Sequence, residues 1–281
     1  MGNDEDLLNP QETDTDKYMQ QMEVTSPLMD IPVQSAIKAL QLPSGSRGLD
    51  AGCGIGLHVP FFADIVGPAG HVTGLDICPK FLMRASEITQ KAGLSQRVAF
   101  QEGDVRKLPF NDNTFDWAWS ANCVGYGLIE PEPSLRELAR VVKPLGTVAI
   151  LSWSSEQLLP GYPLLEARLR ATSSGIAPFI KDKNPKLHFL RALGWFHALG
   201  LKEPTAQTFA GSAHAPLSND IREALSALIE MRWPNVQREL TPEDWAQYQR
   251  LCQPESPDYI LNSPDYYAFF TYSMFHGRVV K

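Results

Sequence analysis

The feature that most constrains the fold is a regular alternation of short apolar runs with longer amphipathic segments between residues 46 and 153. Short apolar runs bounded by turn residues predict strands, and apolar residues spaced three or four apart predict helices. Strand-helix-strand alternation favours a parallel sheet with helices on both faces. The expected strands cover residues 47–50, 71–75, 98–101, 115–120 and 147–153, and the expected helices cover 59–66, 79–92 and 134–142.

The pattern is looser on either side of this region. Residues 1–16 hold six acids and no base, which predicts a disordered acidic tail. Residues 17–45 are expected as an N-terminal helical segment, with its helix over 31–42. We expect residues 46–153 to form the core. Residues 154–281 are expected to complete the sheet, with strands near 206–209 and 266–280, and to carry an inserted helical specificity lobe at 155–190 and 217–262.

Composition excludes several classes of protein. With 43% hydrophobic residues the chain as a whole is not disordered. Beyond the tail, 26 acids face 25 bases, so a surface built to bind nucleic acid is disfavoured. No apolar run approaches the roughly 20 residues that span a bilayer, and no secretory signal is recognisable. The four cysteines form no C-x-x-C pair, which disfavours structural zinc and disulfides and favours a cytoplasmic location.

The most informative short motif is the run Leu49-Asp50-Ala51-Gly52-Cys53-Gly54-Ile55-Gly56, at the end of the first expected strand. Glycines let a backbone turn sharply into a helix whose N–H groups face a ligand. An ordinary glycine turn is the simpler alternative. The spacing differs from the G-x-G-x-x-G of dinucleotide-binding folds, because the third glycine comes one residue early and position 57 is leucine.

The D-x-G-x-G-x-G pattern resembles motif I of the class I S-adenosylmethionine-dependent methyltransferases. Further elements follow in the order of that family, with a small-molecule subgroup related to ubiquinone and menaquinone biosynthesis as the nearest match. The resemblance implies an α/β, Rossmann-like doubly wound fold, whose mostly parallel sheet has seven strands and whose helical lobe is inserted late in the chain. The elements that carry the resemblance are Asp76 after the second strand, Gly103-Asp104-Val105, Leu108-Pro109-Phe110, Phe115-Asp116 and Arg140-Val141-Val142-Lys143-Pro144-Leu145-Gly146.

Three departures from the family pattern stand out. Leu145 replaces the first glycine of the usual pair, and Gly48 weakens the first strand. After the fourth strand the chain reads Cys123-Val124-Gly125-Tyr126 in place of the frequent Leu-His-His. The last departure removes the basis for inferring a particular acceptor from the subgroup.

The resemblance also implies a cofactor, S-adenosylmethionine, with S-adenosylhomocysteine as the product. Asp50 and the loop 52–56 would hold its methionine end, Asp76 its ribose hydroxyls, and Asp104 with Val105 its adenine. Phe81 matches an apolar position near the adenosine, and core packing explains it equally well. The expected cofactor-binding residues are Asp50, Ala51, Gly52, Gly54, Gly56, Asp76, Ile77, Phe81, Asp104, Val105 and Ser120.

The acceptor site is less defined by sequence. Four residues are candidates for it: Tyr18, Asn122, Tyr126 and Trp233. In relatives an N-terminal segment folds over the cofactor, which makes Tyr18 a candidate lid residue. Trp233 could equally pack the core of the lobe. No catalytic residue and no metal site are indicated.

Three functions remain open at this stage. The preferred one is methyl transfer to a small, apolar or aromatic acceptor, with no nucleic acid as partner and an undetermined oligomeric state. The alternatives are a nicotinamide-dependent oxidoreductase and a non-catalytic protein that retains the fold.

Overall fold

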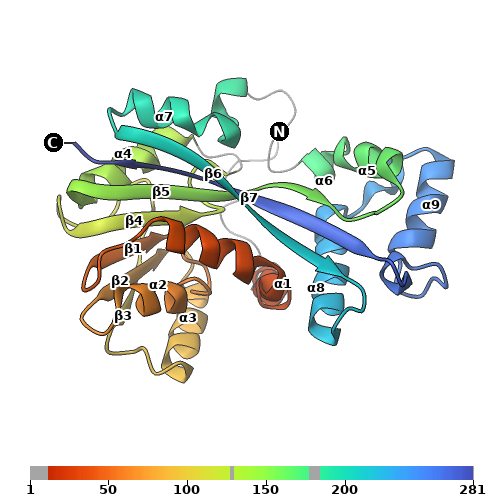
Figure 1. Cartoon of the computed structure of the whole chain (residues 1–281), viewed down its shortest axis with the longest axis horizontal. Helices are drawn as coiled ribbons and strands as arrows, with labels where there is room; N and C mark the ends of the chain where they lie inside the picture. Colours follow the sequence, from red (N-terminus) through yellow and green to blue (C-terminus); the bar gives the residue numbers. More distant parts are fainter. Residues whose placement is uncertain (1–11, 127–129, 177–183, 281) are drawn as a thin grey trace.

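The computed structural model describes residues 12–126, 130–176 and 184–280 and contains one seven-stranded sheet (Figure 1). The strand order is β3-β2-β1-β4-β5-β7-β6, and β7 alone runs antiparallel to its neighbours. The doubly wound prediction is therefore confirmed. The strands are β1 (Arg47–Ala51), β2 (His71–Asp76), β3 (Val98–Glu102), β4 (Phe115–Ala121), β5 (Val142–Gln157), β6 (Lys202–His214) and β7 (Tyr267–Arg278).

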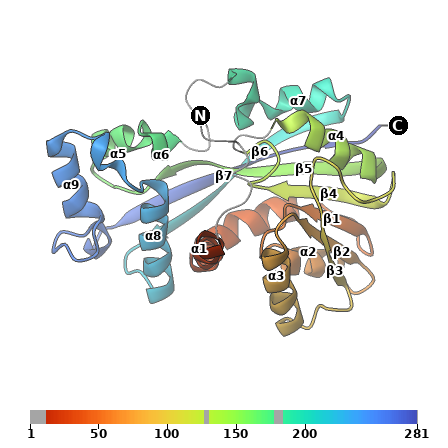
Figure 2. The same ribbon diagram turned by 180° about the vertical axis from the view of Figure 1, so that it is seen from behind.

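Helices cover both faces of the sheet (Figures 1 and 2). On one face α1 and α2 share a hydrophobic cluster with the sheet, and on the other face α4 and α7 share a second cluster. The helices are α1 (Glu12–Ala39), α2 (Val59–Val66), α3 (Pro79–Lys91), α4 (Pro131–Val141), α5 (Pro163–Arg170), α6 (Ser173–Ile176), α7 (Ala192–Ala198), α8 (Asn219–Arg232) and α9 (Pro242–Cys252), with short 3₁₀ turns at Pro185–Leu187, Phe189–Arg191, Val236–Arg238 and Ile260–Asn262.

A helical lobe lies at one end of the sheet. Strands β5, β6 and β7 extend well past the other strands, and α5, α6, α8 and α9 gather around their extended ends (Figure 1). Leu151 of β5 pairs with Ala121, the last residue of β4, and β5 then continues beside β7 to Gln157. The strand predicted over 147–153 is thus longer than expected. Before β6 the chain forms α7, which follows two 3₁₀ turns.

The N-terminal segment differs most from the sequence prediction. Helix α1 begins at Glu12, so residues 12–16, expected in the acidic tail, are helical, and residues 1–11 lie outside the described residues. The helix continues through Pro27 and Pro32. Proline lacks the N–H that would bond to the carbonyl four residues earlier. For Pro27 that carbonyl belongs to Glu23, and the Ser26 hydroxyl donates to it instead, at 2.9 Å.

Two departures from the family pattern have local explanations. A Cβ on Gly48 would lie 1.9 Å from Cζ2 of Trp117, because the indole packs over the glycine. The ring is held there by a 3.0 Å hydrogen bond from its Nε1 to the Ser46 hydroxyl. Leu145 has a φ of 67°, in the left-handed region that favours glycine, and its side chain is exposed.

Candidate functional site

A glycine loop joins β1 to α2 at the carboxyl ends of the parallel strands. Gly52, Gly54 and Gly56 have φ values of 76°, 53° and 74°. The Gly52 N–H donates to the Leu75 carbonyl at 2.7 Å, which ties the loop to the end of β2. A Cβ on Gly52 would lie 2.4 Å from the Cys123 sulfur, so both the backbone angle and the space require glycine there. Ala51 ends β1 and is fully buried.

Asp76, the last residue of β2, organises the same loop. Its Oδ2 accepts the Gly54 N–H at 2.8 Å, and its Oδ1 accepts the Cys78 N–H at 3.0 Å. Burial raises the pKa of this carboxyl, while the backbone donors act to lower it. Each carboxylate oxygen keeps a further lone pair for an outside donor. Asp76 therefore both shapes the loop and presents acceptors beside it.

Asp50 is a buried carboxyl without a donor. Its side chain is 1% exposed, and neither oxygen has a hydrogen-bond partner among the described residues. Burial, and secondarily the charge of Asp76, raises the pKa of Asp50 to about 8. Buried polar groups are rarely left unpaired. Such an acid suits a site where a bound cation or donor completes its contacts.

The acid at the end of β3 has a partner in its own loop. Both oxygens of Asp104 accept from the Arg106 guanidinium, Oδ1 from Nε at 3.0 Å and Oδ2 from Nη2 at 2.7 Å. These hydrogen bonds hold the pKa of Asp104 below its usual value. The following residue, Val105, is buried. Sequence reasoning missed Arg106, although an arginine two residues after the acid was a visible signal.

Helix α1 passes close to the glycine loop and to α3. The ring centroid of Tyr18 is 6.0 Å from that of Phe81 on α3. The Met22 sulfur is the heavy atom nearest to a Cβ placed on Gly54, at 3.6 Å. Two ion pairs, Lys80–Asp16 at 2.7 Å and Arg84–Glu23 at 2.5 Å, connect α1 to α3. Ile77, just before α3, is 53% exposed and so is available to a ligand.

The end of β4 and the turn that follows it lie next to the glycine loop. The Ser120 hydroxyl is buried and accepts the Val124 N–H at 3.3 Å. The side-chain oxygen of Asn122 accepts the Trp153 N–H at 2.9 Å, which fixes this turn to β5. Tyr126 is half-buried, and burial raises the pKa of its hydroxyl to about 12, so it stays protonated at neutral pH.

Trp233 differs from the other acceptor candidates in how deeply it is buried. Its side chain is 1% exposed and belongs to the large hydrophobic cluster that α1, α2 and the lobe share with the sheet. This burial fits the packing alternative, and a place for Trp233 in the acceptor site stays a prediction. Sequence reasoning missed Trp153, Glu156, Arg232 and Tyr272, whose positions depend on how the lobe meets the sheet.

Within the ranges 12–126, 130–176 and 184–280, no three His, Cys, Asp or Glu side chains gather in a way that could hold a metal ion. In the same described part of the chain, no helix is long and apolar enough to cross a membrane.

Comparison with known proteins agrees with this geometry. Residues 49–150 match the model of a methyltransferase domain. A sterol 24-C-methyltransferase of Gibberella zeae is 32% identical over 189 residues, covering 64% of this chain and 47% of that protein. A 2-phytyl-1,4-naphtoquinone methyltransferase of Nostoc punctiforme is 39% identical over 137 residues, covering 48% of this chain and 56% of that protein. The chain spans about half the length of these curated relatives.

A solved structure shares the fold. The YcgJ protein of Bacillus subtilis superimposes with a TM-score of 0.53 at 18% identity, over 89% of this chain and 98% of its own. The matched domain and the related sequences show a methyltransferase domain over residues 49–150, and together with the seven-stranded sheet they support a class I S-adenosylmethionine-dependent methyltransferase.

Proposed function

We propose that this protein transfers a methyl group from S-adenosylmethionine to a small, apolar or aromatic acceptor of quinone or sterol type. The observation that carries the proposal is the unpartnered, buried carboxyl of Asp50 beside the glycine loop. The related sequences that act on a sterol and on a phytylnaphthoquinone support the choice of acceptor class.

The residues of the loop region fit the cofactor. Asp50 and the backbone of Gly52, Gly54 and Gly56 would hold the methionine end, and Asp76 would accept from the two ribose hydroxyls. Asp104 and Val105 would contact the adenine, and Ile77 and Phe81 would flank the adenosine. Ala51 and Ser120 would form the bottom of the cofactor site. The product retained in this site would be S-adenosylhomocysteine.

Methyl transfer requires the protein mainly to place the donor and the acceptor correctly. S-adenosylmethionine, when bound, supplies a methyl group already activated on a sulfonium. The chain's own residues then orient donor and acceptor and exclude water, with α1 as the cover and Tyr18 facing the site. A general base is needed only for an acceptor that loses a proton. Asn122 and Tyr126 are the acceptor-side residues that we propose.

The charge balance and the cysteines support proposals about the partners and the location of the protein. The near balance of charge beyond residue 16 supports a small uncharged acceptor over a nucleic acid. The described cysteines are free thiols, which supports a reducing, cytoplasmic location. We propose no resident metal ion.

Calorimetric titration with S-adenosylhomocysteine tests the proposal, with nicotinamide dinucleotides as the matched control for the oxidoreductase alternative. We expect saturable binding of the first and none of the second. Asp76→Ala should weaken binding on the order of 100-fold, because a charged acceptor of two hydroxyls is lost. Absence of binding at high micromolar concentration would contradict the proposal, and binding without turnover across quinone, phenol and sterol acceptors would favour the non-catalytic alternative.

A further inference from the structure

The extended part of β5 forms a wall beyond the carboxyl end of β4. Parallel α/β sheets bind their ligands at this edge. Trp153 lies just past the last β4–β5 pair and faces Tyr272 of β7 across the ladder. Its indole stacks on Phe270 with a centroid distance of 5.3 Å and meets Tyr272 edge-on at 5.4 Å. The near end of the wall is therefore aromatic.

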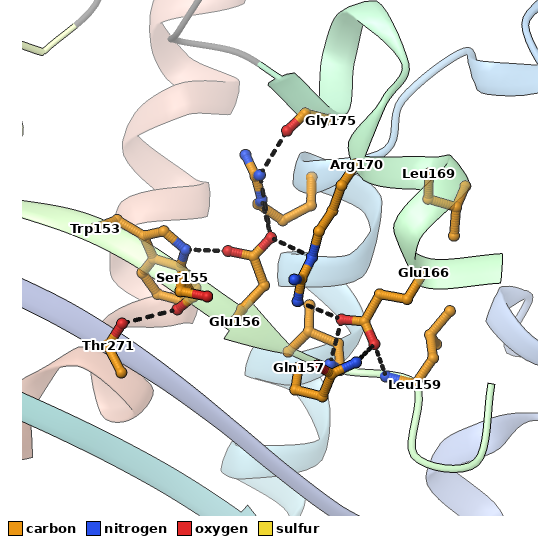
Figure 3. Close-up of polar contacts among 12 residues, drawn as sticks. Trp153, Ser155, Glu156, Gln157, Leu159, Glu166, Leu169, Arg170, Gly175 and Thr271 are labelled. Carbon is orange, nitrogen blue, oxygen red and sulfur yellow. Dashed lines mark hydrogen bonds and ion pairs between the residues drawn. The ribbon is translucent and has the colours of Figure 1, made fainter. Parts of the chain in front are cut away.

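The far end of the wall is ionic (Figure 3). Glu156 is 4% exposed, and both its oxygens are occupied. Oε2 accepts the Trp153 indole N–H, and Oε1 accepts from Arg232, from Nε and Nη2, both at 3.1 Å. Arg232 Nη2 also donates to the Gly175 carbonyl at 2.9 Å. The guanidinium is thus held in one orientation by α6 and β5 together.

A second pair braces the same region from the lobe side. Glu166 of α5 is 1% exposed and accepts from Arg170 at 3.1 Å and from the backbone N–H groups of Leu158 and Leu159. This pair fixes α5 to the end of β5 (Figure 3). Arg170 Nε also lies 4.0 Å from Glu156 Oε1, so the Glu166–Arg170 pair docks α5 beside the Glu156–Arg232 pair.

The ion pair of Glu156 and Arg232 is poorly explained by stability alone. Replacing a buried ion pair by apolar side chains of similar size is often neutral or stabilising. A chain of contacts connects it to the site, since Trp153 bonds to Glu156 through its indole and to Asn122 through its backbone. At the Tyr126 hydroxyl the positive charge of Arg232 affects the pKa more than the negative charge of Glu156 does. The charges of Arg232 and Glu156 both act on the Tyr126 hydroxyl, so the ion pair lies within electrostatic range of an acceptor-side residue that we propose.

We propose that Arg232 is a specificity-determining residue that receives an acidic oxygen of the acceptor, a phenolic or enolic hydroxyl, at the end of the aromatic wall. Glu156 is the positioning residue that holds the guanidinium in place. The proposal rests on the proposed methyltransferase function of the same site. Arg232 would thus select, among apolar and aromatic acceptors, those that carry an ionisable oxygen.

The test uses two probes that differ at one oxygen. 2-Hydroxy-1,4-naphthoquinone carries an ionised oxygen at neutral pH, and 2-methoxy-1,4-naphthoquinone carries the neutral ether. Their dissociation constants are measured for the full chain saturated with S-adenosylhomocysteine. We expect the wild type to prefer the hydroxy probe by about tenfold, the usual worth of a charge-assisted hydrogen bond. Arg232→Met should abolish the preference, leave the methoxy probe unchanged, and leave S-adenosylhomocysteine affinity unchanged.

Control variants keep the outcome decisive. Arg168→Met removes another lobe cation, paired with Asp244 at 2.5 Å, and should keep the preference. Arg232→Lys keeps the charge without the planar fork, so the preference should fall to a few-fold; this variant decides if Arg232→Met does not fold. An unchanged preference in either Arg232 variant would overturn the proposal, as would a wild type without preference. Loss of S-adenosylhomocysteine binding in the wild type would instead contradict the proposed function.

Discussion

The guanidinium of Arg106 holds the carboxylate of Asp104 through both oxygens, with its Nε 3.0 Å from Oδ1 and its Nη2 2.7 Å from Oδ2. The Arg106 backbone N–H adds a third bond to Oδ1 at 2.8 Å. Asp104 is the acid that we propose for the adenine amine. An amine donor must therefore share this carboxylate with an arginine from the same loop.

This competition gives the first prediction. Arg106→Ala should tighten binding of S-adenosylhomocysteine by about threefold, because the carboxylate no longer divides its charge-assisted bonds. Asp104→Ala should weaken binding by about tenfold. When Arg106→Ala is combined with Asp104→Ala, the threefold gain in affinity should vanish, since Arg106 acts only through Asp104. Weaker binding by Arg106→Ala alone, measured by calorimetry, would mean that the arginine itself contacts the ligand.

Gly52 and Gly93 supply a matched pair for the glycine loop. Both have positive φ, 76° and 71°. A Cβ on Gly52 would meet the Cys123 sulfur at 2.4 Å, whereas a Cβ on Gly93 would meet nothing within 4 Å. Alanine at Gly93 should cost only the strain of the left-handed backbone, about 1 kcal/mol of unfolding free energy. Alanine at Gly52 should cost more, by roughly another 1–3 kcal/mol of overpacking, and should also weaken cofactor binding.

Denaturant unfolding of the two variants checks this prediction. Cys123→Ala in the Gly52→Ala background should restore part of the lost stability, because it removes the atom that the new methyl meets. Equal losses at Gly52 and Gly93 would show that the loop moves aside freely.

Leu145 offers a prediction independent of the site. Because its side chain is exposed, the leucine contributes little buried apolar area to stability. Its φ of 67° also places the backbone in the left-handed region, which is strained for leucine. Its backbone is well held, with its N–H donating to the Val279 carbonyl at 2.9 Å. Leu145→Gly should therefore raise the free energy of unfolding by up to about 1 kcal/mol, partly offset by the greater freedom of glycine in the unfolded chain. A lower melting temperature would contradict this account.

The sheet was predictable because its signals are local. Strand and helix periods, and turns such as the one at residues 67–70, depend on neighbouring residues alone, so β1 to β4 were placed to within a residue or two. Within the helical segment expected over 17–45, a helix was placed only over 31–42, because Pro27 and Pro32 interrupt the local pattern. Its length depends on burial of Leu28 and Ile37 against the sheet and on the Ser26 hydroxyl, which tertiary packing decides.

In the candidate site, too, residues marked by local sequence patterns were predicted and residues that depend on tertiary packing were not. Asp50 and Asp76 lie at the carboxyl ends of β1 and β2, so sequence order alone put them at one edge of the sheet. The Glu156–Arg232 contact joins residues 76 positions apart and depends on the docking of α8 against β5. No local pattern in the sequence marks such a pair. For Trp233, the aromatic character suggested a cavity, whereas its position at the end of α8 buries it in the core.

The last prediction concerns the buried acid Asp50, whose pKa is raised to about 8. An unfolded aspartate has a pKa of about 4. Between these two values the folded protein holds a proton that the unfolded chain has lost, so this group makes stability fall as pH rises from about 4 to about 8. Asp50→Asn mimics the protonated form, and its stability should lack this decline.

Cofactor binding should show the opposite trend. A ligand ammonium favours the ionised carboxyl, so binding must expel the proton at pH values below about 8. The affinity for S-adenosylhomocysteine should therefore rise from pH 6 to pH 8, by at most about tenfold per pH unit for one proton. Calorimetry in two buffers of different ionisation enthalpy should detect the released proton. In Asp50→Asn both the rise and the released proton should disappear, and a wild-type affinity that is flat over this range would show that Asp50 does not face the ligand's charge.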